Sequence, residues 1–479
     1  MRHVLADLMD AAAGRADYAD VRHVSSVAEN IATRNGRVDL VRHDGDEGFG
    51  VRVRIGGAWG FAAARGSEKR AAESALERAI AVAEAQPKVG AAAPLAPEAP
   101  AQGSYATALV TDPFEVPLEE KIALLLAADG GMRVDTRVTL TVAQFSAYRQ
   151  DKLFASTDGA LCEQRIVECG GGIVATATNE SDAQVRSYPG SHREHVAQAG
   201  WEHFAGLGVV DNAPRVGEEA VALLSAPQCP AGRTTLVLDG EQVALQVHES
   251  VGHALELDRV LGREASYAGT SFVQASDLGS LKYGSEHMNV AADATCAGGL
   301  GSFGWDDEGV AGHRFPLIEG GVLRGFLSSR EAAAEIGLER SGGCMRADGF
   351  ARQPIIRMTN VNLAPGDAGS LEDLISDTDD GVYLETNRSW SIDNRRLQFQ
   401  FATETAWEIR GGERGRLLRN PSYAGITPEF WGKLDAVCSE SEWRLWGLLN
   451  CGKGEPGQTM HVSHGAAPAR FRDVQVGVA

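Results

Sequence analysis

The segment LQVHESVGHALELD, residues 245–258, contains the most informative residues of the chain. It contains two imidazoles, His248 and His253, and a carboxylate, Glu249, directly after the first. Neutral imidazoles are common zinc ligands, and a nearby carboxylate that does not bind the metal can take the proton of the attacking water. The segment therefore predicts a hydrolytic zinc site with His248 and His253 as ligands and Glu249 as the general base.

The spacing of the two histidines predicts a local distortion. In an HExxH helix the two histidines lie about 40° apart around the axis, so both reach one metal. The additional residue here moves His253 to about 140° from His248, which a straight α-helix cannot reconcile with a shared metal. Gly252 precedes His253 and is the position where we expect a π-bulge or a kink. The alternative is a regular helix with two ordinary histidines.

A catalytic zinc usually keeps three protein ligands and one open position, so a third ligand is needed. Cys451 is a candidate because Gly452 and Gly454 allow close approach of the backbone and Lys453 favours a thiolate. The alternative for Cys451 is a small buried thiol. Glu256 and Asp258 either support a ligand histidine or cap and solvate the helix end. Further ligand candidates are His287, His313, His461, His464 and the other thiols.

Length and composition indicate a multidomain globular protein. The chain has 479 residues, 43% of them hydrophobic and 23% charged, which is too long for a single core. No run approaches the ~20 apolar residues of a membrane helix. The N-terminus, MRHVLADLMDAAAG, carries acidic residues where a signal peptide is apolar. We therefore expect a cytoplasmic protein without a membrane partner.

The charge balance argues against a nucleic-acid partner. The formal net charge is −20, whereas phosphate binding draws on clustered lysine and arginine. The seven cysteines, an odd number scattered through a long chain, fit reduced thiols better than a disulfide framework.

Periodicity predicts an α+β protein with two domains. Residues 1–225 form a mixed α/β domain with successive hairpins, turning at Asn35-Gly36 and Asp44-Gly45, and long helices, one at residues 68–86. Residues 226–479 form a β-rich catalytic domain that carries the HExxxH helix, which follows a strand at residues 234–238. Short helices are expected only near residues 329–335 and 370–377. Asp306, Asp307 and Glu308 are expected in a turn with a solvated acidic face.

Five separated blocks follow one another along the chain: HESVGHALELD at 248–258, GSFGWDDEGV at 301–310, FPLIEGGVLRGFLSSREAA at 315–333, PIIRMTNVNLAPGD at 354–367 and NCGKGEPGQ at 450–458. In this order they resemble the TldD/PmbA family of zinc metalloproteases, whose members are also labelled modulators of DNA gyrase. The resemblance covers nearly the whole chain. The chain departs from the family pattern at residues 386–401, TNRSWSIDNRRLQFQF, where the family often has a glycine-rich strand start.

The resemblance implies Cys451 as the third ligand of one zinc ion per chain. It also implies cleavage of small or unfolded peptides, including maturation of peptide precursors. The expected assembly is a homodimer or a heterodimer with a TldE/PmbA-like paralogue that lacks the metal motif. Two alternatives stay open: a non-catalytic regulatory or binding subunit of such a complex, and a hydrolase acting on amides other than peptides. Retention of Glu249 argues against the regulatory subunit, because a structural zinc site needs no general base.

Overall fold

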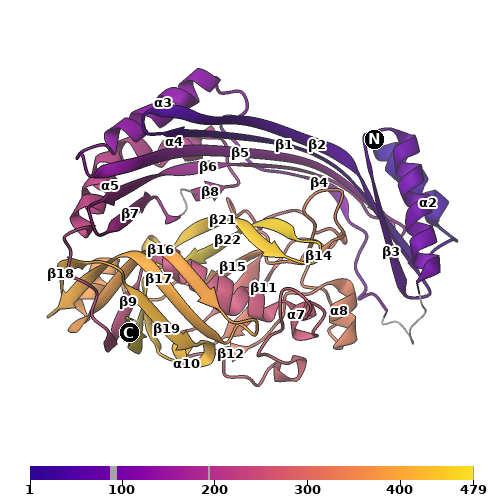
Figure 1. Ribbon diagram of the computed structural model, residues 1–479. Coiled ribbons are helices and arrows are strands. Elements are labelled where there is room, and N and C mark those ends of the chain that lie inside the picture. The colour runs from indigo at the N-terminus through magenta and orange to yellow at the C-terminus, as the bar shows by residue number, and fades with distance from the viewer. Residues whose placement is uncertain (87–93, 192–194, 478–479) are drawn as a thin grey trace.

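The computed structural model describes residues 1–86, 94–191 and 195–477. A long, curved sheet from the first half of the chain arches over a region of shorter strands from the second half (Figure 1). Helices pack on both ends of this sheet, and the fold is α+β, as the sequence predicts. The division into domains at residues 225 and 226 stays a prediction.

The curved sheet has the order β3-β2-β1-β5-β6-β4, and β7 and β8 also pair with β6. Two helices form one apolar core with the sheet, α1 (Arg2–Ala12) and α2 (Lys69–Ala85). A second core includes α3 (Leu118–Gly131), α4 (Trp201–Gly206) and α5 (Val209–Leu223). The strands are β1 (Tyr18–Arg34), β2 (Arg37–Ile55), β3 (Ala58–Arg65), β4 (Gln102–Ala106), β5 (Val138–Ser156), β6 (Leu161–Thr178), β7 (Ala183–Tyr188) and β8 (His195–Ala197).

One predicted hairpin turn is confirmed and the other is wrong. Asn35 and Gly36 both have positive φ and join β1 to β2, as a two-residue hairpin turn requires. Asp44-Gly45 instead lies inside β2, where the two residues pair with Ala28 and Val27 of β1. β2 pairs with β1 through residues 40–54 without a break and with β3 through residues 48–55, and these pairings override the local turn preference.

The second half contains a sheet of order β12-β11-β10-β15-β22-β21 and a ring of β16, β9, β23, β19 and β17, which closes because β17 also pairs with β16. The strands are β9 (Gly232–Leu238), β10 (Val290–Asp293), β11 (Arg314–Glu319), β12 (Val322–Leu323), β13 (Met345–Arg346), β14 (Ile355–Ile356), β15 (Asn360–Leu363), β16 (Asp380–Ile392), β17 (Gln398–Arg410), β18 (Glu413–Leu418), β19 (Ser422–Ile426), β20 (Leu434–Val437), β21 (Arg444–Lys453), β22 (Gln458–Ala466) and β23 (Ala469–Val476).

The two short helices predicted in this half are confirmed as α8 (Arg330–Glu335) and α9 (Leu371–Ser376). The hydroxyls of Ser329 and Ser370 accept hydrogen bonds from the first turn of each helix, as serine N-caps do. Three further short helical segments in this half are α10 (Thr427–Trp431), η4 (Ala275–Asp277) and η5 (Glu440–Glu442).

The expected solvated turn at Asp306, Asp307 and Glu308 is wrong, because all three acids are buried. Asp307 pairs with Arg22 and Lys152 of the curved sheet at 3.2 and 2.6 Å. Burial alone raises the pKa of Asp307, but these two cations hold it below its ordinary value. Asp307 is therefore part of the contact between the two halves, and its two cationic partners lie more than 150 residues away in sequence.

Within the described ranges, every helix is too short or too polar to span a lipid bilayer.

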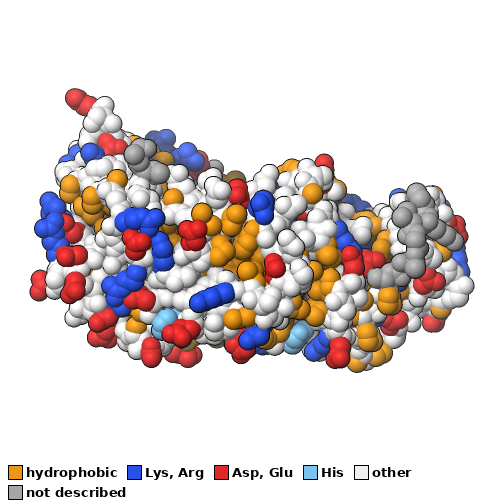
Figure 2. Space-filling model, turned by 90° about the horizontal axis from the view of Figure 1, so that it is seen from below, with side chains coloured by type: hydrophobic (Ala, Val, Ile, Leu, Met, Phe, Trp, Pro, Cys, Tyr) orange, Lys and Arg blue, Asp and Glu red, His pale blue; other side chains and the backbone are white. Residues whose placement is uncertain are grey.

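The face of the molecule shown in Figure 2 carries acidic and basic side chains interspersed with one another, with hydrophobic side chains near its centre. No continuous basic stripe crosses this face. The absence of a nucleic-acid partner stays a prediction that rests on the net charge.

Candidate metal centre

The helix that carries the histidines starts at a strand-to-helix junction, as predicted. After β9, the Asp239 carboxylate accepts a hydrogen bond from the backbone N–H of Gln242 at 2.7 Å and caps α6 (Gly240–Val247). The helix continues as a π-helical turn, η2 (His248–Gly252), then as a 3-10 turn, η3 (His253–Leu255), and as α7 (Leu257–Val260). The distorted helix predicted from the histidine spacing is confirmed.

The π-helical turn brings the two histidines onto one face. The backbone N–H of His253 donates to the carbonyl of His248, five residues earlier, so the wider turn absorbs the additional residue. The two ring centroids lie 4.7 Å apart. A Cβ at Gly252 would lie 2.1 Å from the sulfur of Met358, so a larger residue here requires the Met358 side chain to move. The backbone of Gly252 is helical, so glycine is not required there by a left-handed conformation.

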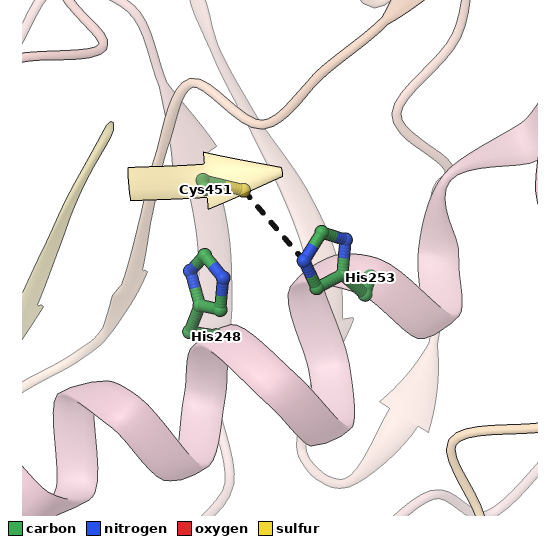
Figure 3. Close-up of side chains that lie close together, drawn as sticks. All are labelled: His248, His253 and Cys451. Atoms are coloured by element: carbon green, nitrogen blue, oxygen red, sulfur yellow. Dashed lines mark hydrogen bonds between the residues drawn. The ribbon is translucent and has the colours of Figure 1, made fainter. Parts of the chain in front are cut away.

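Cys451 of β21 lies opposite the two histidines, which project toward it from the distorted helix (Figure 3). The ligand atoms of His248, His253 and Cys451 all lie within 4.8 Å of one another, and all three residues are buried. Cys451 Sγ is 3.6 Å from His253 Nε2, close to the ~3.5 Å that tetrahedral coordination of one zinc imposes on a nitrogen and a sulfur. The structure thus brings together the three predicted ligands.

His464 determines which nitrogen of His248 is free. His464 Nδ1 lies 2.9 Å from the carbonyl of Val361, which only accepts, so Nδ1 carries the proton. Burial keeps both rings neutral, since it lowers the pKa of His248 to about 4 and that of His464 well below its ordinary value. His464 Nε2 therefore accepts from His248 Nδ1 at 2.7 Å. His248 Nε2 keeps its lone pair, as a metal ligand must.

Glu256 determines in the same way which ring nitrogen of His253 is free. Its carboxylate lies 2.9 Å from His253 Nδ1 and accepts that N–H, so the lone pair of Nε2 faces Cys451. Burial lowers the pKa of His253 well below its ordinary value, which keeps the ring neutral. Glu256 is fully buried, so the alternative of a solvated helix cap is wrong for this residue.

The predicted electrostatic role of Lys453 is wrong. Its ammonium donates to Asp258 at 2.7 and 2.9 Å and to the carbonyl of Ile356 at 2.8 Å, so its charge is matched by an acid instead of the thiol. Asp258 is accordingly buried against Lys453 and supports no histidine.

The pKa of the Cys451 thiol is shifted in the opposite direction from the pKa of each of the other six cysteines. Burial alone raises its pKa, but the buried guanidinium of Arg357 opposes this effect, and the pKa lies below its ordinary value. Arg357 also donates to the backbone carbonyl of Cys451. Burial raises the pKa of the other cysteines, which are Cys162, Cys169, Cys229, Cys296, Cys344 and Cys438.

Glu249 lies beside this group without belonging to it, and its carboxylate forms an ion pair with Arg396. Arg396 has a positive φ and lies between β16 and β17, where its carbonyl accepts from Thr427 at 2.8 Å. Sequence reasoning missed Arg396, which lies in the segment that departs from the family pattern. Both side chains line a cavity of about 350 Å³ together with His248, His253 and Cys451.

The remaining candidate histidines lie elsewhere. His287 is exposed, His313 contacts the carbonyl of Ala311, and His461 pairs with Glu168 at 2.5 Å on the side of the curved sheet. Sequence reasoning named His464 only as a possible ligand, and no local pattern indicates its role as the acceptor for His248.

Replacing His464 with alanine is expected to weaken zinc binding by about 10–100-fold, because His248 then loses the acceptor that fixes its tautomer. Competition with a chromophoric chelator measures the dissociation constant. His464→Gln places an amide oxygen near the position of Nε2 and should recover part of the loss, and His287→Ala is the control for removal of an exposed imidazole. Equal zinc affinity in His464→Ala and the wild type contradicts this role.

Most of the chain matches the models of one known protein family. Family models match residues 19–83 (PmbA/TldA metallopeptidase domain 1), 111–226 (central domain) and 231–478 (C-terminal domain). The chain is 32% identical over 476 residues to a metalloprotease from Methanothermobacter thermautotrophicus, covering 99% of this chain and 97% of that protein. It is 27% identical to a zinc metalloprotease TldD homolog from Saccharolobus solfataricus, over 52% of each chain.

A solved structure shares the fold along the full length. The crystal structure of TldE from Thermococcus kodakarensis superimposes with a TM-score of 0.74 at 16% identity, covering 99% of this chain and 100% of that one. Similarity at this identity is evidence about the fold alone. The family models and the near-complete match to a metalloprotease together show that this chain belongs to the PmbA/TldA metallopeptidase family.

Proposed function

We propose that this chain is a zinc-dependent metallopeptidase that hydrolyses peptide bonds in small or unfolded peptides, including peptide precursors. The observation that carries the proposal is the meeting of His248, His253 and Cys451 in one cavity that Glu249 also lines. The names of the relatives support it, since they are metalloproteases and one of them is a zinc metalloprotease.

The donor set fits zinc. Two neutral imidazoles with free Nε2 atoms and a thiol whose pKa is lowered are ligands that zinc prefers, and three of them leave one position open, as in catalytic sites. His248, His253 and Cys451 would hold the ion. When bound, zinc supplies Lewis acidity that acidifies water and polarises a carbonyl.

Glu249 is the general base in this proposal. Its carboxylate takes one proton from the attacking water as the oxygen bonds to the peptide carbon, and it returns that proton to the leaving amine when the C–N bond breaks. Arg396 holds the carboxylate at the wall of the cavity. One water is consumed, and the products are a carboxylic acid and an amine.

The cavity lies between two strand edges that suit an extended peptide. Residues 389–392 of β16 pair with β17 on one side, whereas β9 pairs only with residues 381–384. Among the described strands, β21 pairs only with β22. Side chains from both edges line the cavity, so a peptide can add to either edge through backbone hydrogen bonds, which require an unfolded substrate. The lining residues are Trp390, Ser391 and Ile392 of β16 and Leu448, Asn450 and Gly452 of β21.

We also propose a dimer, formed either by two copies of this chain or with a TldE/PmbA-like paralogue. The resemblance to the TldD/PmbA family implies this assembly, and the TldE structure from Thermococcus kodakarensis shares the fold of this chain.

The direct test is peptide cleavage by the zinc-loaded chain. A disulfide-stabilised test protein is offered folded, and again after reduction and alkylation, and products are identified by mass spectrometry. Cleavage is expected only for the unfolded form, should stop with 1,10-phenanthroline and should return with added zinc. Absence of cleavage by a chain that holds zinc contradicts the proposal, and equally fast cleavage of the folded form contradicts the proposed substrate class.

A further inference from the structure

A second, smaller cavity of about 50 Å³ adjoins the metal cavity. The two share Leu245 and His248 of the distorted helix, Trp390 of β16, and Leu448 and Asn450 of β21. A peptide whose carbonyl lies at the metal ligands therefore has the side chain of a neighbouring residue at the mouth of the smaller cavity.

The walls of the smaller cavity are mainly apolar and come from three separate elements. Ala244 and Leu245 belong to α6, Trp390 to β16, and Trp446 and Leu448 to β21. The Trp390 side chain is 38% exposed, although the neighbouring metal ligands are buried. Large apolar side chains exposed beside a buried polar site are typical of a surface that binds an apolar ligand group.

The polar groups of this cavity do not favour a cationic side chain. Glu241 is the acid among the lining residues, and its two carboxylate oxygens already accept the backbone N–H groups of Ser191 and Asn387 at 2.7 and 3.1 Å. The small volume of about 50 Å³ and the mainly apolar walls suit a compact aliphatic side chain better than a long cationic one.

We propose that this cavity binds the side chain of a residue next to the scissile bond and selects aliphatic side chains of valine or leucine size. The inference rests on the proposed function, because it places a peptide bond at the metal ligands. It adds a preference that backbone pairing to a strand edge does not supply. A leucine fills the cavity and an alanine leaves most of it empty, so a preference of about 10–100-fold in kcat/KM is expected.

The first measurement uses peptides of the form acetyl-Gly-Gly-X-Gly-Gly-amide with the zinc-loaded chain. A single variable residue X tests both sides of the scissile bond, because the enzyme can cleave before or after it. We expect kcat/KM for X = Leu to exceed that for X = Ala by about 10–100-fold, with X = Lys no better than X = Ala. Equal rates for Leu and Ala, or the highest rate for Lys, overturn the inference.

Two substitutions should change the preference in opposite directions. Ala244→Leu fills the cavity and should bring the Leu-to-Ala ratio close to one, whereas Leu448→Ala enlarges it and should move the best residue from leucine toward phenylalanine. Ala81→Leu, on the exposed face of α2, is the matched control and should keep the wild-type ratio. An unchanged ratio in both cavity variants overturns the inference.

Ligand binding without catalysis separates this inference from the proposed function. Trp390 and Trp446 line the cavity, so tryptophan fluorescence of the metal-free chain should change saturably with N-acetyl-leucinamide and much less with N-acetyl-glycinamide. Ala244→Leu should abolish the difference. Selective binding in a zinc-loaded chain that cleaves nothing supports the cavity and contradicts the metallopeptidase. Peptide cleavage without a preference for leucine in either assay supports the metallopeptidase and contradicts the proposed cavity.

Discussion

Replacing Glu249 with glutamine is expected to lower kcat for peptide cleavage by about 10²–10⁴-fold while about one zinc ion stays bound per chain. The amide has nearly the same shape as the carboxylate but cannot take the proton of the attacking water. Because Glu249 lines the cavity and is not one of the three grouped ligand residues, the metal content should not change. Steady-state kinetics and elemental analysis of the same sample measure the two quantities.

Loss of the base must be separated from loss of the Glu249–Arg396 ion pair. Arg396→Gln removes that ion pair and keeps the carboxylate, so its loss of kcat should be at least about tenfold smaller than that of Glu249→Gln. Glu319→Gln, at an exposed position on β11, is the control for the same chemical change. If Glu249→Gln cleaves peptides at the wild-type rate with zinc bound, Glu249 is not the general base.

Removing a ligand should empty the site. Wild-type chain is expected to contain about one zinc ion, and Cys451→Ala and His253→Ala less than about a tenth of that, with peptide cleavage lost in parallel. Two ligands remain in each variant, which is fewer than catalytic zinc sites in proteins use. Elemental analysis after dialysis against a weak chelator measures the content, and circular dichroism shows whether each variant is folded.

Matched controls test whether the loss of zinc is specific to His248, His253 and Cys451. Cys296→Ala removes a half-buried thiol and His287→Ala an exposed imidazole, and both should keep about one zinc per chain. A folded, zinc-supplemented wild type that contains no zinc contradicts the predicted site and favours the non-catalytic regulatory subunit. Full zinc content in Cys451→Ala shows that another residue is the third ligand.

Local sequence predicted the features that depend on helix geometry and capping. The five-residue separation of His248 and His253 indicated a distorted helix because an α-helix advances about 100° per residue, whatever the rest of the fold. The short helices expected near residues 329–335 and 370–377 each begin after a serine, because a short polar side chain can satisfy backbone N–H groups within its own turn. Helix distortion and capping depend on residues that are neighbours in the chain, so a short segment of sequence is enough to predict them.

The tertiary structure alone decided which distant residues complete the site. The residue types and their spacing left Cys451 as one candidate ligand among several, and only the family resemblance selected it. In the structure, β21 places Cys451 opposite the histidines, 198 residues beyond His253. His464 and Arg396 became partners of His248 and Glu249 only through packing of β22 and of the β16–β17 connection. Asp307 is buried because its cations lie on the curved sheet. The local shape of the helix that carries His248 and His253 follows from residues close together in the chain, whereas contacts across hundreds of residues depend on how the sheets pack, which no local pattern encodes.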